Sequence, residues 1–167
     1  MKPLRIAADT NVLLDLADEV EFVLDALAVI EERLSQPDKI ATPSVLEELA
    51  FLCDSGSSAA LRLSARRAFR QLRQERRFRP FLELPFPPET VEEIAGEIRR
   101  GRLLPEEEIH DARILAEAVL MNCGILLTSD EHLRSIEHEA MTLTLKRLDF
   151  APPVIATPRE IVRKFFR

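Results

Sequence analysis

Residues 6–11 constrain the fold more than any other part of the chain. A short apolar run at 6–8 ends directly in the carboxylate of Asp9, and the apolar residues of 12–16 follow at helical spacing. This pattern predicts a buried β-strand that is followed at once by a helix. Ligands bind at the carboxyl ends of strands in open α/β sheets, so Asp9 is expected at a binding site.

Size and composition indicate an ordinary globular protein. With 167 residues, of which 46% are hydrophobic, the chain can form a core as a single domain over residues 1–167. It contains no apolar stretch long enough to span a membrane, and residues 1–5 lack the apolar segment of a secretory signal. We therefore expect a cytoplasmic protein without membrane contact, in which Cys53 and Cys123 are free thiols.

Charge is distributed unevenly along the chain. The net charge of −6 argues against nucleic-acid binding by bulk charge alone. However, residues 62–79 hold eight arginines and a single acid, whereas residues 89–108 hold seven glutamates. Guanidinium groups suit phosphates, so one helix face could follow an RNA backbone, although a solvated helix face explains the same pattern equally well. The arginines of that face are Arg62, Arg66, Arg70, Arg73 and Arg77.

Hydrophobic periodicity and capping signals predict alternating strands and helices. The expected strands are 6–8, 39–42, 81–84, 125–128 and a final edge strand at 142–148. The expected helices are about 10–17, 22–34, 43–53, 59–77, 90–100, 105–122 and 157–165, with a short helix after residues 129–131. This alternation is typical of an α/β fold, here a three-layer sandwich with a mostly parallel sheet of about five strands and helices on both faces.

Several carboxylates are expected at one edge of this sheet. Asp9 and Asp130 each follow an apolar strand. Asp111 lies on the apolar stripe of its helix, while Arg113 and Glu117 are expected on the opposite, exposed face. Because a buried carboxylate without a partner costs several kcal/mol, Asp111 needs a partner.

A fourth acid comes from the helix after the second strand. Glu48 falls nearer the apolar stripe than Glu47 and is the better candidate. Singly, each acid has an ordinary explanation, because Asp9 and Asp130 can be helix caps, Asp111 can pair with an arginine and Glu48 can be solvated. Together they favour a metal site, since several carboxylates in one cleft stay ionised only beside a cation. Mg²⁺, or Mn²⁺, takes such oxygen ligands, and it can orient a water and stabilise charge on a phosphodiester.

Five segments carry a resemblance to a known family. The segments are ADTNVLL (8–14), TPSVLEEL (42–49), IHDARILAEA (109–118), ILLTSDEHL (125–133) and TPREI (157–161). In this order they resemble the PIN-domain ribonucleases, in particular the VapC-like toxins of toxin–antitoxin systems. The resemblance implies a metal-dependent endoribonuclease with an RNA substrate, an antitoxin partner and a homodimeric state.

The resemblance also assigns roles to single residues. It implies that an acidic quartet binds the metal and performs catalysis, and that three polar residues position ligands or substrate. The quartet is Asp9, Glu48, Asp111 and Asp130, and the polar residues are Thr10, Asn11 and Ser129. The chain departs from the family at His132, where many members carry a further acid, and in the additional stretch 62–79.

Other functions remain to be weighed. The glycines form neither G-x-G-x-x-G nor a P-loop, which excludes a dinucleotide-binding Rossmann site. A phosphotransferase that uses Asp9 as nucleophile is disfavoured, because Asn11 rather than a second acid stands two positions later. A catalytically inactive PIN-like module that only binds RNA or protein is the alternative that the sequence leaves open.

Overall fold

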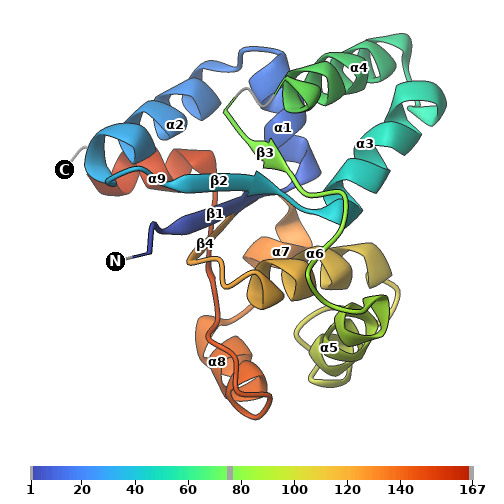
Figure 1. Ribbon diagram of the computed structural model, residues 1–167, viewed down its shortest axis with the longest axis vertical. Helices are drawn as coiled ribbons and strands as arrows, with labels where there is room; N and C mark the ends of the chain where they lie inside the picture. Colours follow the sequence, from blue (N-terminus) through green and yellow to red (C-terminus); the bar gives the residue numbers. More distant parts are fainter. Residues whose placement is uncertain (1, 75–76, 166–167) are drawn as a thin grey trace.

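A five-stranded parallel sheet forms the centre of the computed structural model, which describes residues 2–74 and 77–165 (Figure 1). The strands are β1 (Arg5–Ala8), β2 (Asp38–Ala41), β3 (Arg79–Pro80), β4 (Ile125–Leu127) and β5 (Val154–Ala156). Their order in the sheet is β3-β2-β1-β4-β5, and each neighbouring pair is parallel. The predicted α/β class with a parallel sheet of about five strands is confirmed.

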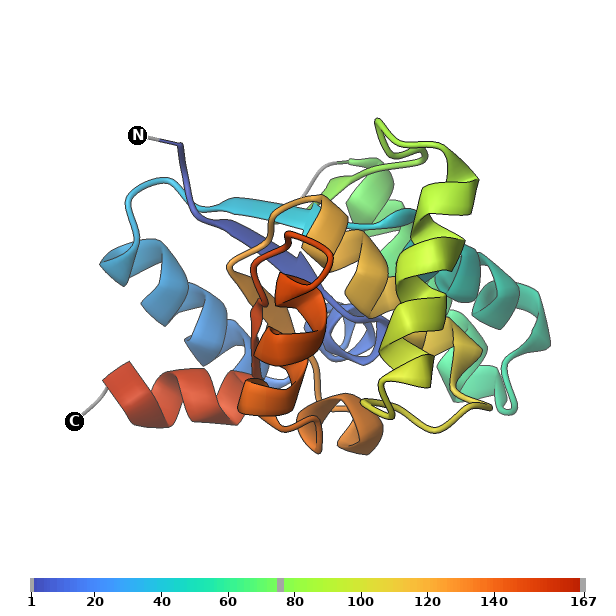
Figure 2. The ribbon, with the colours of Figure 1, turned by 90° about the horizontal axis from the view of Figure 1, so that it is seen from below.

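Helices cover both faces of the sheet. They are α1 (Thr10–Ala17), α2 (Glu21–Arg33), α3 (Pro43–Ser55), α4 (Ala59–Arg73), α5 (Pro88–Arg100), α6 (Ile109–Leu120), α7 (Glu131–Arg134), α8 (His138–Lys146) and α9 (Pro158–Phe165). In Figure 1, α1, α2 and α4 lie above the sheet, and α5, α6 and α8 lie below it. Figure 2 shows the same layers from below, with α9 beside α2. Across residues 2–74 and 77–165, every helix is too short or too polar to cross a lipid bilayer.

The core lies on both sides of the central strands. Ile6, Ile40 and Leu126, from β1, β2 and β4, are fully buried. Strands that are covered on both faces need continuous apolar runs, as these have. Cys53 and Cys123 are free thiols, as expected, and Cys123 is buried.

One predicted strand is wrong, and several boundaries move. Residues 142–148 belong largely to helix α8, and the edge strand is β5. The alternating Thr and Leu residues fit a strand, but Met141 and Leu145, four residues apart, are both buried on one helix face. The third strand is β3 at 79–80, ahead of the predicted 81–84, and α6 begins at Ile109 after a turn at 105–108 rather than at Pro105.

The predicted helix 59–77 is observed as α4, which ends at Arg73. The last part of that prediction, residues 75 and 76, lies outside the described residues. Arg77 has a positive φ of 67° and stands outside the helix.

Asp38 fastens the edge of the sheet. Its carboxylate accepts hydrogen bonds from Arg5 Nε at 2.8 Å and from Arg79 Nη2 at 2.8 Å. Burial opposes ionisation, but these hydrogen bonds and charges outweigh it and hold the pKa of Asp38 below its ordinary value. One side chain thus ties β1 and β2 to the short strand β3.

Replacing this carboxylate is expected to destabilise the fold. Asp38→Asn should lower the free energy of unfolding at pH 7 by about 1–2 kcal/mol, because two hydrogen bonds to a charged group are weakened. The lowered pKa means that this stabilisation is complete at neutral pH and is lost as the pH falls through the folded-state pKa of Asp38. Urea unfolding of both proteins at pH 7 and pH 3 measures the difference. Asp25→Asn, at an exposed position of α2, is the control; equal stability of parent and Asp38→Asn at pH 7 would contradict this assignment.

Candidate active site

The ends of β1 and β4 meet at Asp9. The Asp9 amide donates to the Leu127 carbonyl at 2.8 Å, and Thr128 Oγ1 donates to Asp9 Oδ2 at 2.6 Å. Asp9 is only 3% exposed, and its Oδ1 accepts from the amide of Thr10 at 2.7 Å at the start of α1. It is therefore both a helix cap and a buried carboxylate at the carboxyl end of the sheet.

Asn11 and the loop after β4 extend this network. Asn11 Nδ2 donates to Asp9 Oδ2 at 3.2 Å, and Asn11 Oδ1 accepts from the amide of Ser129 at 3.0 Å. The Asp130 amide donates to Thr128 Oγ1 at 2.9 Å, and the Asp130 carboxylate caps α7. The polar residues after both strands are thus joined by direct hydrogen bonds.

Glu48 reaches the same place from α3. Thr10 Oγ1 donates to Glu48 Oε2 at 2.5 Å, and His110 Nε2 lies 3.1 Å from the same oxygen. Burial opposes ionisation of Glu48, but the contacts with His110 and Thr10 prevail and hold its pKa below the ordinary value. Glu47 is exposed and lines a different cavity.

Asp111, in the first turn of α6, is half-buried. Within the described part of the chain, its side chain has no hydrogen bond or ion pair with another residue. Burial raises the pKa of the Asp111 carboxyl to about 7, and nearby negative charges add to the effect. Those charges belong to Asp130, Asp9 and Glu108.

The fold thus brings the four predicted acids together. Burial raises the pKa of Asp9, and the charges of Glu48 and Asp130 add to this shift while its hydrogen bonds oppose it. Asp111 is coupled to the same two aspartates, Asp9 and Asp130. Four carboxylates from α3, α6 and the ends of β1 and β4 therefore form one electrostatic unit.

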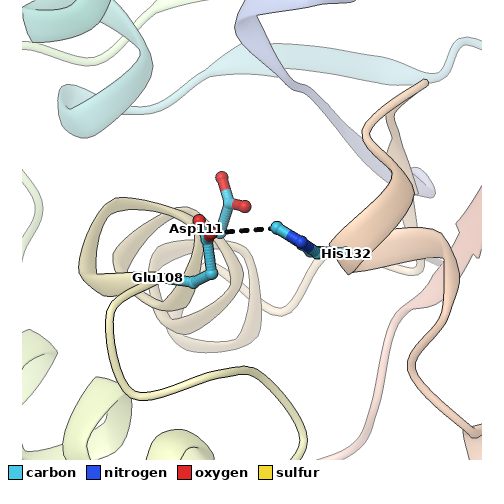
Figure 3. Close-up of side chains that lie close together, drawn as sticks. All are labelled: Glu108, Asp111 and His132. Carbon is cyan, nitrogen blue, oxygen red and sulfur yellow. Dashed lines mark ion pairs between the residues drawn. The ribbon is translucent and has the colours of Figure 1, made fainter.

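The sequence analysis missed two residues beside this group. Glu108, Asp111 and His132 each offer one ligand atom, and these atoms all lie within 4.8 Å of one another (Figure 3). Glu108 precedes Asp111 by three residues, a spacing that places both near one helix end, and His132 was noted only as a departure from the family. His110, the partner of Glu48, was seen only as a neighbour of Asp111 in sequence.

The expected exposure of Glu117 is wrong. Glu117 is 4% exposed, and its carboxylate accepts from the Ser44 amide at 3.1 Å and from Ser44 Oγ at 2.8 Å. A carboxylate at a helix N-terminus satisfies free amides and complements the helix dipole. Glu117 therefore caps α3 from α6, a role that the sequence of either helix alone does not reveal. Arg113, predicted on the same exposed face, is part-exposed and lies 2.6 Å from Glu92.

The predicted arginine face is divided in the structure. Arg66, Arg70 and Arg73 line an open hollow of about 440 Å³ together with Phe69 and Cys53. Arg62 instead donates to the carbonyl of Gly56 at 2.8 Å, and Arg77 Nη1 lies 3.9 Å from Glu31. The hollow and the four acids share no residue.

Comparison with known proteins agrees with this arrangement. The model of the PIN domain matches residues 6–139, most of the chain. The chain belongs to the PIN domain family. Its matched region includes all four acids of the site.

Two solved structures have a similar fold to this PIN domain protein. A chain of VapBC2 from Rickettsia felis, crystallised with a DNA fragment from their promoter, has a TM-score of 0.60 at 12% identity, covering 92% of this chain and 98% of that one. A chain of VapBC-1 from nontypeable Haemophilus influenzae has a TM-score of 0.55 at 15% identity, covering 93% and 98%. No curated protein matches the sequence significantly.

The donor set fits a hard divalent cation. Carboxylate oxygens are the ligands that Mg²⁺ and Mn²⁺ prefer, and the raised pKa of Asp111 reports uncompensated negative charge. The buried Asp9 and the half-buried Asp111 are the central members of this set.

Removing the Asp111 charge is expected to stabilise the metal-free protein. Because the pKa of Asp111 is raised to about 7, the cost of ionising it in the fold grows from about pH 4 to pH 7 and stays constant above. Asp111→Asn should therefore unfold at a higher temperature than the parent at pH 8 in EDTA, by about 1 kcal/mol of stability, and show no gain at pH 4.

Calorimetry with and without Mg²⁺ or Mn²⁺ checks this prediction. The cations should stabilise the parent and have a much smaller effect on Asp111→Asn. Glu93→Gln, exposed on α5, removes the same charge and should change neither property. A destabilised Asp111→Asn at pH 8 would show that the carboxylate serves the fold.

Proposed function

We propose that this protein is a metal-dependent endoribonuclease that hydrolyses RNA phosphodiester bonds. PIN domains are generally nucleases, and the chain belongs to that family. The observation that carries the proposal is the meeting of four acids at the carboxyl end of the sheet, with the pKa of Asp111 raised to about 7 and no cation of the described chain paired with it. Like charges are arranged in this way where a divalent ion binds.

The residues divide into two roles. Asp9, Glu48, Asp111 and Asp130 would hold Mg²⁺ or Mn²⁺. When bound, such an ion activates a water and stabilises charge on the phosphodiester. Thr10 and His110 hold Glu48 in place through its Oε2 atom. Asn11 and Ser129 join the ends of β1 and β4, and there they would orient ligands or substrate.

A role as the toxin of a toxin–antitoxin pair extends this proposal. The two similar structures are of VapBC proteins, and this chain covers 98% of each matched chain. We infer a VapC-like toxin that binds an antitoxin protein and pairs as a homodimer. Both interactions are accessible by mixing the chain with the product of any small gene beside its own and measuring the mass of the complex.

Cleavage of single-stranded RNA tests the enzymatic proposal. The parent should cleave a labelled RNA with Mg²⁺ or Mn²⁺ and not in EDTA. Asp9→Asn and Asp111→Asn should each reduce the rate by at least about 100-fold, because a charged ligand is lost. Glu48→Gln should also impair cleavage, whereas Glu47→Gln, one residue away and exposed, should not. Cleavage that survives both aspartate changes would disprove the metal site, and binding without cleavage by the parent would favour a binding module.

The arginine hollow is proposed as a contact for the RNA backbone. Arg66, Arg70 and Arg73 line it, and guanidinium groups bind phosphate oxygens as forks. The Arg70→Gln, Arg73→Gln double variant should weaken RNA binding by about tenfold at low salt, and the loss should shrink as salt increases. Fluorescence anisotropy with the uncleaved RNA and Asp111→Asn background measures this. Arg163→Gln with Lys164→Gln, exposed on α9, is the matched control; an equal loss there would mean unspecific charge attraction.

A further inference from the structure

Three side chains from two segments form a mixed donor set next to the four acids. Glu108 immediately precedes α6, Asp111 lies in its first turn, and His132 comes from α7 (Figure 3). Their ligand atoms lie within 4.8 Å of one another, and His132 Nδ1 is 3.0 Å from Glu108 Oε1. Three donors at this spacing can reach a common cation.

The supporting structure holds these donors in register. Leu133, next to His132, is fully buried, and its amide donates to the Asp130 carboxylate at 3.0 Å. The Glu108 carbonyl accepts from the Ala112 amide at 3.1 Å in the first turn of α6. The His132 side chain is 49% exposed and that of Glu108 is 28% exposed, so an ion can reach both from solvent.

Charge also favours a cation at this position. Asp111 makes no hydrogen bond or ion pair within the described residues, although Glu108 adds negative charge beside it. The imidazole of His132 brings a neutral nitrogen donor rather than a further carboxylate. Two carboxylates and one imidazole therefore supply ligands without adding a third negative charge.

The imidazole changes which ion the set prefers. Mg²⁺ takes oxygen ligands and retains its waters, whereas first-row transition ions accept nitrogen and oxygen donors together. Many relatives carry an acid where this chain has His132, so the difference concerns this chain in particular.

We propose that Glu108, Asp111 and His132 form a second cation site, which binds a divalent transition metal ion in preference to Mg²⁺. The site shares Asp111 with the four acids and deepens the proposed metal-dependent function, on which its biological use rests. The ion class follows from the donor set, and Mn²⁺ is the probe because it is paramagnetic and tolerates carboxylate ligands.

Binding of Mn²⁺ to the full chain without RNA tests the site. In titrations followed by electron paramagnetic resonance, His132→Ala and Glu108→Gln should each lose one bound Mn²⁺ or bind it at least about tenfold more weakly. In proton NMR, Mn²⁺ should broaden the imidazole signals of His132 at low occupancy. His138→Ala, which removes an exposed histidine of α8, should leave Mn²⁺ binding unchanged.

Metal preference provides the second measurement. Excess Mg²⁺ should displace Mn²⁺ poorly from this site in the parent and readily in His132→Asp, because the replacement restores an all-oxygen set. Unchanged Mn²⁺ stoichiometry and affinity in both His132→Ala and Glu108→Gln would overturn the proposal and leave an ordinary surface pair. Loss of RNA cleavage with intact Mn²⁺ binding at His132 would instead contradict the nuclease proposal alone.

Discussion

The hydrogen bonds between the ends of β1 and β4 are the constraint on which the rest of the site depends. Because β1 and β4 are parallel neighbours, Asp9 and Thr128 leave the sheet at the same edge, and the Thr128 hydroxyl donates to Asp9 at 2.6 Å. The amide of Asp130 donates to the same hydroxyl at 2.9 Å. One threonine thereby fixes two carboxylates that are far apart in sequence. A break in this pairing would separate the acids before any other part of the core is disturbed.

Glu117 provides the second constraint, between helices rather than strands. It caps α3 from α6 and is buried while doing so. Glu48 lies one turn beyond Ser44 on α3, and Asp111 lies at the start of α6. The cap therefore sets the position of two site acids relative to each other, although Glu117 itself faces the backbone of α3 rather than the site.

Local patterns predicted the parts of this protein that are local in origin. The apolar runs that end in Asp9 and Asp130 indicated β1 and β4, and the parallel sheet followed from the alternation with helices. Residues 142–148 were misassigned because alternating Thr and Leu fit both a strand and a helix, and burial against neighbouring helices decides between them. The burial of Glu117 and the meeting of Glu108 with His132 depend on contacts between distant segments, so no local period contains them.

The site is also where the fold departs from its own electrostatic pattern. Elsewhere, half-buried acids have partners from the chain, as Asp38 has in Arg5 and Arg79. The chain is rich in arginine, yet no arginine or lysine of the described residues pairs with Asp111. A fold selected for stability alone would place a cation there or remove the charge, since each option relieves the raised pKa. Local conflict of this kind is typical of functional sites, and it implies that the balancing charge comes from solution rather than from the protein.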